Sequence, residues 1–216
     1  MNILLGFDPG GAGAFGWCVS ELSHELPLRV RNTGIANHAE DAVAAALAEL
    51  TTSDSVSAAA IDAPLLWAAA GDRRSDQFIR TRILALGASA GSVQHVSSLQ
   101  GACLVQGILA GMLLRERYST LPLSESHPKA FLWLMGLATD ASPPPTIALS
   151  DLHRLLATDG RVVSDHERDA AIATLSAWAM LTRPLDWTEL FHLEPRPYTP
   201  LATPLEYWIP TPSNVA

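Results

Sequence analysis

The sequence has no apolar run long enough to cross a membrane, because Gly, Arg, Gln and Ser interrupt its richest region. The opening residues Met1-Asn2-Ile3 also carry no basic leader, and the apolar run that follows is too short for a signal peptide. The only two cysteines, Cys18 and Cys103, stand in apolar stretches without the spacing of metal ligands. We therefore expect a cytoplasmic protein with buried free thiols and no membrane partner.

Basic residues are also scarce, with 14 Lys and Arg against 22 Asp and Glu and a net charge of −8. Proteins that coat long nucleic acids usually present a basic face, so this composition disfavours extended duplex binding. It leaves a small anionic substrate, or a short or structured nucleic acid held through metal ions. With 216 residues, of which 48% are hydrophobic and 17% charged, the chain is long enough for one sizeable core.

Alternating apolar runs and helical patterns predict an α/β fold. Short apolar runs bounded by turn residues indicate strands at 3–7, 14–19, 26–31, 57–61 and 121–125. Helical patterns cover 39–50, 99–117 (mostly buried), 126–137, 147–157 and 165–180, the last capped by Ser164 or Asp165. We expect a mixed sheet, in which an antiparallel hairpin joins parallel strands, within a domain at 1–185. Residues 186–216, rich in Pro and aromatics, are expected to be a tail packed on the core, with an edge strand near 206–209.

Five acids stand where such a fold gathers side chains. Asp8, Asp62 and Glu125 each follow a predicted strand, and the carboxyl ends of parallel strands share one edge of a sheet. Asp165 and Asp169 are four residues apart, on one face of a helix. Grouped carboxylates repel one another unless cations are present, and oxygen ligands suit Mg²⁺ or Mn²⁺. Two such ions, roughly 3.5–4 Å apart, would serve phosphodiester hydrolysis.

Each acid taken singly also has a structural explanation. Asp8 and Asp62 precede turn-forming residues, Asp165 can cap its helix and Asp169 can offset the helix dipole. Glu125 can be a surface strand end. The combination of three strand-end acids with a pair at one helix start favours a metal site.

Basic residues and histidines near these acids are candidates for substrate contacts. Lys129 and Arg80 are placed to hold phosphate, although Arg80 can pair instead with Asp76, four residues earlier. His127 and His166 stand beside candidate ligands and are candidates for proton transfer. For Arg73 and Arg74 a solvated face, with Asp72 and Asp76 as partners, is the preferred interpretation.

Taken together, these pieces resemble the RNase-H-like superfamily, and more closely the family of predicted RNase-H-like nucleases catalogued as domain of unknown function 429. The pieces span residues 6–171: Gly6-Phe7-Asp8, Ile61-Asp62-Ala63-Pro64-Leu65, Arg73 with Asp76 and Arg80, Glu125-Ser126-His127-Pro128, and Asp165-His166 with Asp169-Ala170-Ala171. The resemblance implies an RNase H fold in which Asp8, Asp62 and Asp169 or Asp165 match the superfamily's acidic positions. Glu125 and Pro128 match the narrower family's motif. Arg168 departs from the more acidic run that family members often show.

The sequence therefore predicts a Mg²⁺- or Mn²⁺-dependent nuclease with Asp8, Asp62, Glu125 and Asp169 as its catalytic acids, Asp165 as a further metal ligand, and Arg80, Lys129 and His127 contacting the substrate. A nucleotide-binding protein of the actin-like ATPase and sugar-kinase type is an alternative, because Asp8-Pro9-Gly10 mimics its Asp-x-Gly turn. A second alternative is a non-catalytic scaffold that keeps the fold. The oligomeric state is not indicated.

Overall fold

A computed structural model describes residues 1–11, 13–68, 73–93, 101–138, 152–158, 164–195 and 197–211. The helices are α1 (Ala39–Ala48), α2 (Arg74–Ala85), η1 (Ala90–Ser92), α3 (Gly101–Arg117), α4 (Pro128–Leu134), α5 (Asp165–Thr182) and η3 (Phe191–Leu193). The strands are β1 (Asn2–Asp8), β2 (Phe15–Glu21), β3 (Leu28–Ala36), β4 (Ser55–Ile61), β5 (Trp67–Ala68), β6 (Leu123–Glu125), β7 (Leu156–Ala157), β8 (Trp187–Glu189), β9 (Pro197–Tyr198) and β10 (Leu205–Pro210). None of the helices formed by these residues is long and apolar enough to cross a bilayer.

Eight strands form one mixed sheet in the order β7-β3-β2-β1-β4-β6-β10-β8. β1 pairs antiparallel with β2, and β2 pairs antiparallel with β3. On the other side, β4, β6 and β10 continue the sheet in parallel with β1. The predicted mixed sheet, an antiparallel hairpin joined to parallel strands, is therefore confirmed.

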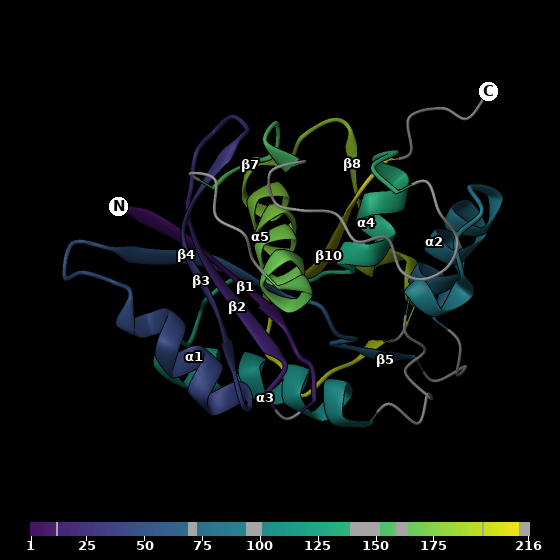
Figure 1. Cartoon of the computed structure of the whole chain (residues 1–216). Helices are drawn as coiled ribbons and strands as arrows, with labels where there is room; N and C mark the ends of the chain where they lie inside the picture. Colours follow the sequence, from purple (N-terminus) through teal and green to yellow (C-terminus); the bar gives the residue numbers. More distant parts are fainter. Residues whose placement is uncertain are drawn as a thin grey trace.

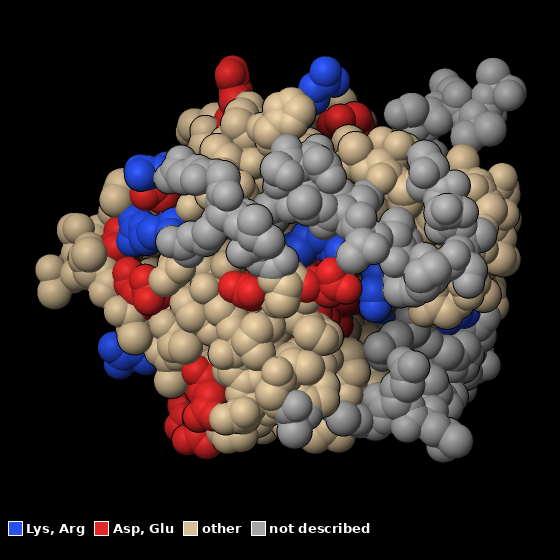
Figure 2. Space-filling view, in the orientation of Figure 1, with Lys and Arg blue, Asp and Glu red and all other residues tan. Residues whose placement is uncertain are grey.

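The helices cover both faces of this sheet. α5 lies across one face, with α4 and α2 beside it, whereas α1 and α3 lie on the opposite face (Figure 1). One buried cluster includes α5, α4 and α2, and a second joins α1 and α3 to the inner strands. On the face drawn in Figure 2, acidic and basic side chains lie close together across the middle of the molecule.

Two glycines allow α5 to approach the sheet closely. A Cβ built on Gly6 would lie 1.9 Å from the carbonyl oxygen of Ala170, and one built on Gly16 would lie 2.1 Å from that of His166. No side chain fits at either distance. The close approach places the first half of α5 directly over β1 and β2.

Several predicted elements need correction. The strand expected near residues 206–209 is present as β10, but it is not an edge strand, because β8 pairs outside it. Helix α3 is not mostly buried, since Val105, Leu109 and Met112 are exposed. The helix predicted at 147–157 does not reach its expected end, because Leu156–Ala157 form β7, and residues 147–151 fall outside the described residues.

Candidate active site

Two of the predicted acids lie side by side at the end of the parallel strands. Asp8 is the last residue of β1, and Asp62 follows the last residue of β4 directly. Phe7 and Ile61 are paired in the register, and the Asp62 amide donates a hydrogen bond to the carbonyl oxygen of Phe7 at 2.8 Å. The main chain therefore fixes the two acids next to each other.

Helix α5 brings a third acid to the same place. Its N-terminus is fixed by a capping box, in which the Ser164 hydroxyl accepts from the Glu167 amide and the Glu167 carboxylate accepts from the Ser164 amide. Nδ1 of His166 lies 2.6 Å from Oδ2 of Asp8. Asp169, nearly one turn further along, is buried with 2% of its surface exposed. Asp8 is two residues after Gly6, so both positions lie on the same face of β1, the face that α5 covers.

The charges of Asp8, Asp62 and Asp169 act on one another. Burial, followed by the negative charges of Asp8 and Asp169, raises the pKa of Asp62 well above its usual value, and Lys129 acts in the opposite direction. Burial also raises the pKa of Asp169 to about 6; Arg168 opposes this rise and Asp8 adds to it. The hydrogen bond to Asp8 raises the pKa of His166. Raised pKa values of this kind are typical of carboxylates arranged to hold a cation.

Glu125 has different surroundings. Glu125 pairs in the register with Ile61, and Ile61 pairs with Phe7, the residue before Asp8. Successive residues of a strand point to opposite faces of the sheet, so Glu125 and Asp8 point to opposite faces. Its Oε1 accepts from Arg73 at 2.6 Å and lies 2.8 Å from Nε2 of His127. Its Oε2 accepts from the Leu65 amide at 2.8 Å and from Arg73 at 2.9 Å. Both oxygens of this carboxylate therefore already have hydrogen-bond partners. Glu125 is fully buried, so its explanation as a surface strand end is wrong.

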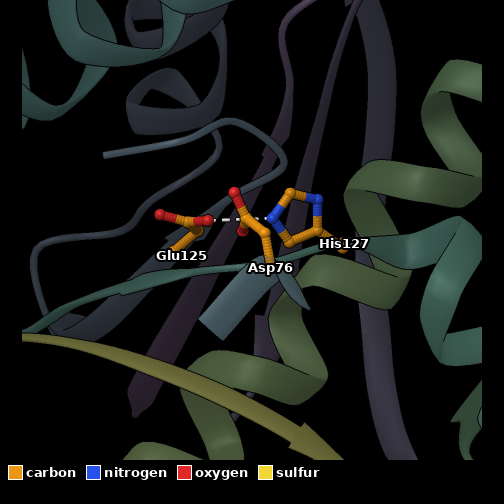
Figure 3. Close-up of side chains that lie close together, drawn as sticks. All are labelled: Asp76, Glu125 and His127. Carbon is orange, nitrogen blue, oxygen red and sulfur yellow. Dashed lines mark hydrogen bonds and ion pairs between the residues drawn. The ribbon is translucent and has the colours of Figure 1, made fainter. Parts of the chain in front are cut away.

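Arg73 is the cation of this second cluster. Its guanidinium also binds Asp76 through Nε at 2.8 Å and Nη2 at 2.5 Å, and its side chain is fully buried. The expectation that Arg73 lies on a solvated face is thus wrong, although Asp76 is its partner as predicted; Arg74 is exposed. Asp76, Glu125 and His127 offer ligand atoms within 4.8 Å of one another (Figure 3), but Arg73 already supplies the positive charge between the two carboxylates.

The pKa values in this cluster follow from the same contacts. Although burial alone would raise it, the pKa of Glu125 is lowered to about 2 by the Arg73 guanidinium and the hydrogen bond with His127. Burial raises the pKa of Asp76 in spite of Arg73. His127 connects the two clusters, since its Nδ1 lies 3.7 Å from Oδ1 of Asp62.

Arg168 contacts two acids of its own helix, Asp169 and Asp165. Only 3% of its side chain is exposed; its Nε and Nη2 lie 2.8 and 2.6 Å from Oδ1 of Asp169. Its Nη1 lies 3.3 Å from Asp165, whose own side chain is 64% exposed. Asp165 therefore stands at the rim of the site, and Asp169 stands inside it.

The other two residues predicted to contact the substrate, Lys129 and Arg80, lie in different clusters. Lys129 is exposed, and its charge acts on Asp62, Asp169 and His166, so it lies at the acidic site. Arg80 turns toward Asp76 at 3.7 Å and the carbonyl oxygen of Val93, so the ion pair considered from the sequence is present.

Two side chains of the site have little signal in the sequence. His166 stands there only as a neighbour of candidate ligands, because its contact with Asp8 spans 158 positions of the chain. The inward turn of Arg168 has no sequence signal beyond its position between Asp165 and Asp169.

The sequence and the structure were compared with known proteins. No family model matches the sequence, and no curated protein matches it. A solved structure described as "Thermus thermophilus RuvC structure" aligns at 15% identity over 84% of this chain and 96% of that chain, with a TM-score of 0.49. A second, "T. thermophilus RuvC in complex with Holliday junction substrate", aligns at 13% identity over 83% and 95%, with a TM-score of 0.41.

The chain has an RNase H-like fold. The order of its strands and the helices on both faces of the sheet agree with the fold that the sequence resemblance implies. Similarity at this identity carries no conclusion about activity. The function is therefore argued from the site itself.

Proposed function

We propose that this protein is a metal-dependent nuclease that hydrolyses phosphodiester bonds at the site formed by Asp8, Asp62 and Asp169. One observation carries the proposal: the strand register sets Asp62 beside Asp8, and α5 buries Asp169 close enough that the charges of Asp8 and Asp169 raise the pKa of Asp62. A fold gains nothing in stability from such repulsion, so the arrangement is best explained by a cation.

The donor atoms fit Mg²⁺ or Mn²⁺. They are carboxylate oxygens on rigid elements, and these hard ligands suit hard divalent cations better than zinc. Such an ion, when bound, supplies a polarised phosphoryl oxygen and a water of lowered pKa. We assign the ion to Asp8, Asp62 and Asp169. The mechanism with two ions remains a prediction.

The side chains around the acids have supporting roles in this proposal. His166 holds Asp8 through the 2.6 Å contact and is placed to exchange a proton at Nδ1. Lys129, which is exposed beside the acids, is the candidate phosphate contact. Glu125, His127 and Arg80 are engaged in the second cluster, so we assign them to holding the site in shape.

The substrate we propose is a short or structured nucleic acid. On the part of the face that the described residues form in Figure 2, basic side chains are interspersed with acidic ones and form no broad basic surface. Together with the net charge of −8, this favours local contacts at the site over a long electrostatic track. Membership of the domain-of-unknown-function-429 family and a cytoplasmic location are further proposals that rest on the sequence.

The test is cleavage of labelled DNA and RNA, single-stranded, double-stranded and branched, by the purified protein with Mg²⁺ or Mn²⁺. We expect cleavage that EDTA stops and that Asp62→Asn reduces at least a hundredfold, since this change removes a ligand at the sheet's edge. Asp186→Asn is the matched control, because Asp186 is exposed beyond the far end of α5. Equal cleavage by Asp62→Asn and the wild type would point to a contaminant.

One observation favours a different function. Arg168 binds Asp169, which is compatible with a non-catalytic protein that has replaced a metal by a guanidinium. In that case Mn²⁺ would not raise the melting temperature, whereas binding at the proposed site raises it.

A further inference from the structure

His127 lies between the two clusters of the site. Its Nε2 lies 2.8 Å from Oε1 of Glu125, and its Nδ1 lies 3.7 Å from Oδ1 of Asp62. The ring is almost fully buried and packs against Tyr207, with ring centroids 5.3 Å apart. The main chain is held as well, because the His127 carbonyl oxygen accepts from the Phe131 amide at 2.9 Å. The fold therefore fixes the direction in which each ring nitrogen points.

Glu125 decides which nitrogen of this ring carries a hydrogen. Although burial opposes it, the Arg73 guanidinium lowers the pKa of Glu125 to about 2, so the carboxylate is ionised at neutral pH. An ionised carboxylate only accepts hydrogen bonds, so Nε2 carries the hydrogen of the 2.8 Å contact. In the neutral ring the lone pair is then on Nδ1, the nitrogen that faces Asp62. Histidines that bind metals have this arrangement, with the second ring nitrogen donating to a carboxylate.

The distance between Nδ1 and Asp62 suits a shared cation. At 3.7 Å the two atoms are too far apart for a hydrogen bond. Two ligand atoms that each lie about 2.1 Å from one ion are separated by roughly 3–4 Å, depending on the angle between the two bonds. The other carboxylates of this cluster, Asp76 and Glu125, are already paired with Arg73. Asp62 is therefore the acid with which His127 can share an ion.

Two further groups act at the same acids. Lys129 counteracts the rise in the pKa of Asp62, but an ammonium group has no lone pair and cannot be a ligand. Nδ1 of His166 lies at hydrogen-bonding distance from Oδ2 of Asp8, 2.6 Å, so this nitrogen is already paired with a carboxylate. Neither group has the geometry that His127 shows toward Asp62.

We propose that His127 is a metal ligand, and that its Nδ1 binds the same divalent cation as Asp62 while Glu125 holds the ring in the tautomer that leaves the lone pair on Nδ1. This inference rests on the proposed function and adds one nitrogen to the oxygen ligands assigned there. His127 thus has a direct bond to the ion besides its part in holding the site in shape. Glu125 acts on the ion through the ring, without being a ligand itself.

The bond can be detected without any substrate, because a nitrogen bound to Mn²⁺ gives a hyperfine coupling in pulsed electron paramagnetic resonance. We use His166→Ala as the background, so that the second imidazole near the acids does not contribute. We expect the coupling in this background and its loss when His127→Phe is added, since Phe keeps a ring against Tyr207 without a nitrogen. Calorimetry should show that the added change weakens Mn²⁺ binding by roughly tenfold or more. His192→Phe, at a histidine that is 62% exposed, is the matched control and should leave both readouts unchanged.

Each outcome bears on one of the two proposals or on both. Mn²⁺ bound to His166→Ala without a nitrogen coupling, or a coupling that survives in a folded double variant, would overturn ligation by His127 and leave the nuclease proposal standing. No saturable binding of Mn²⁺ to the wild type would overturn both. Should the double variant fail to fold, anomalous diffraction from wild-type crystals soaked in Mn²⁺ decides: an ion bonded to Nδ1 supports the inference, and an ion bound by carboxylates alone refutes it.

Discussion

At the scale of single residues, the Arg73 cluster shows how a buried charge is kept in a fold. Removing a guanidinium from water is costly, and Arg73 recovers this cost through paired contacts with two carboxylates. The ring of Tyr207 lies 5.8 Å from the same guanidinium. The cluster thus joins α2 to β6 and β10.

Replacing Arg73 by Met should destabilise the protein by roughly 3–5 kcal/mol, because two buried carboxylates would lose their shared cation. Urea unfolding at neutral pH measures the change. Arg74→Met, at the exposed neighbouring position, should stay within about 0.5 kcal/mol of the wild type. Equal losses for the two variants would mean that the buried cluster contributes little.

Glu125 should give this cluster a pH signature. Its folded-state pKa of about 2 lies below the ordinary value of 4.5, so its contribution to stability is present above about pH 4.5 and is lost as the pH falls toward 2. The shift corresponds to about 3 kcal/mol. The difference in unfolding free energy between wild type and Glu125→Gln should therefore shrink between pH 5 and pH 2. A difference that stays constant over this range would contradict the assigned pKa.

At the scale of elements, the contact between α5 and the sheet decides whether the site exists. Asp8 stands on β1, while His166 and Asp169 stand on α5, and Gly6 and Gly16 set the distance between the two elements. The helix could not lie this close over ordinary side chains.

Gly6→Ala should cost roughly 1–3 kcal/mol of stability, since the new methyl group meets the carbonyl oxygen of Ala170 and forces α5 outward. The same movement should weaken Mn²⁺ binding. Gly11→Ala is the control, because a Cβ at Gly11 meets nothing within 4 Å. Urea unfolding and Mn²⁺ titration of both variants check the prediction, which fails if Gly6→Ala behaves as Gly11→Ala does.

At the scale of the whole molecule, the last part of the chain completes the sheet. β10 lies between β6 and β8, and its residues Leu205, Tyr207, Trp208 and Ile209 are all buried. Tyr207 packs against His127, with ring centroids 5.3 Å apart, so this segment also supports the cluster behind the site. The division into a domain at 1–185 and a tail at 186–216 stays a prediction.

A chain ending at residue 186 should show no cooperative unfolding transition. It would lose four buried side chains of β10, each worth about 1.5–3 kcal/mol, against a total stability of roughly 5–15 kcal/mol. A chain ending at residue 211 keeps every described strand and is the control. Thermal unfolding followed by circular dichroism distinguishes the two, and a normal transition in the shorter chain would show that β8 and β10 are dispensable.

The sequence by itself determined the elements and part of the site. Apolar runs that stop at Asp8 and Asp62 predict strand ends because hydrophobic periodicity and turn residues act locally. Ser164 is found as the cap of α5 for the same reason, as its partner Glu167 is three residues away. The burial of Arg73 and Arg168 and the pairing of Arg73 with Glu125 have no local signal, since exposure depends on which elements pack over a side chain.

Only the tertiary structure decided which acids share a site. Asp8, Asp62 and Glu125 look alike in the sequence, but a register offset of one row turns Glu125 away from Asp8 and toward Arg73. Asp165 and Asp169 also look alike, yet the close packing of α5 at Gly6 buries one and leaves the other at the rim. Register and packing distance arise from contacts between distant parts of the chain, so no local pattern contains them.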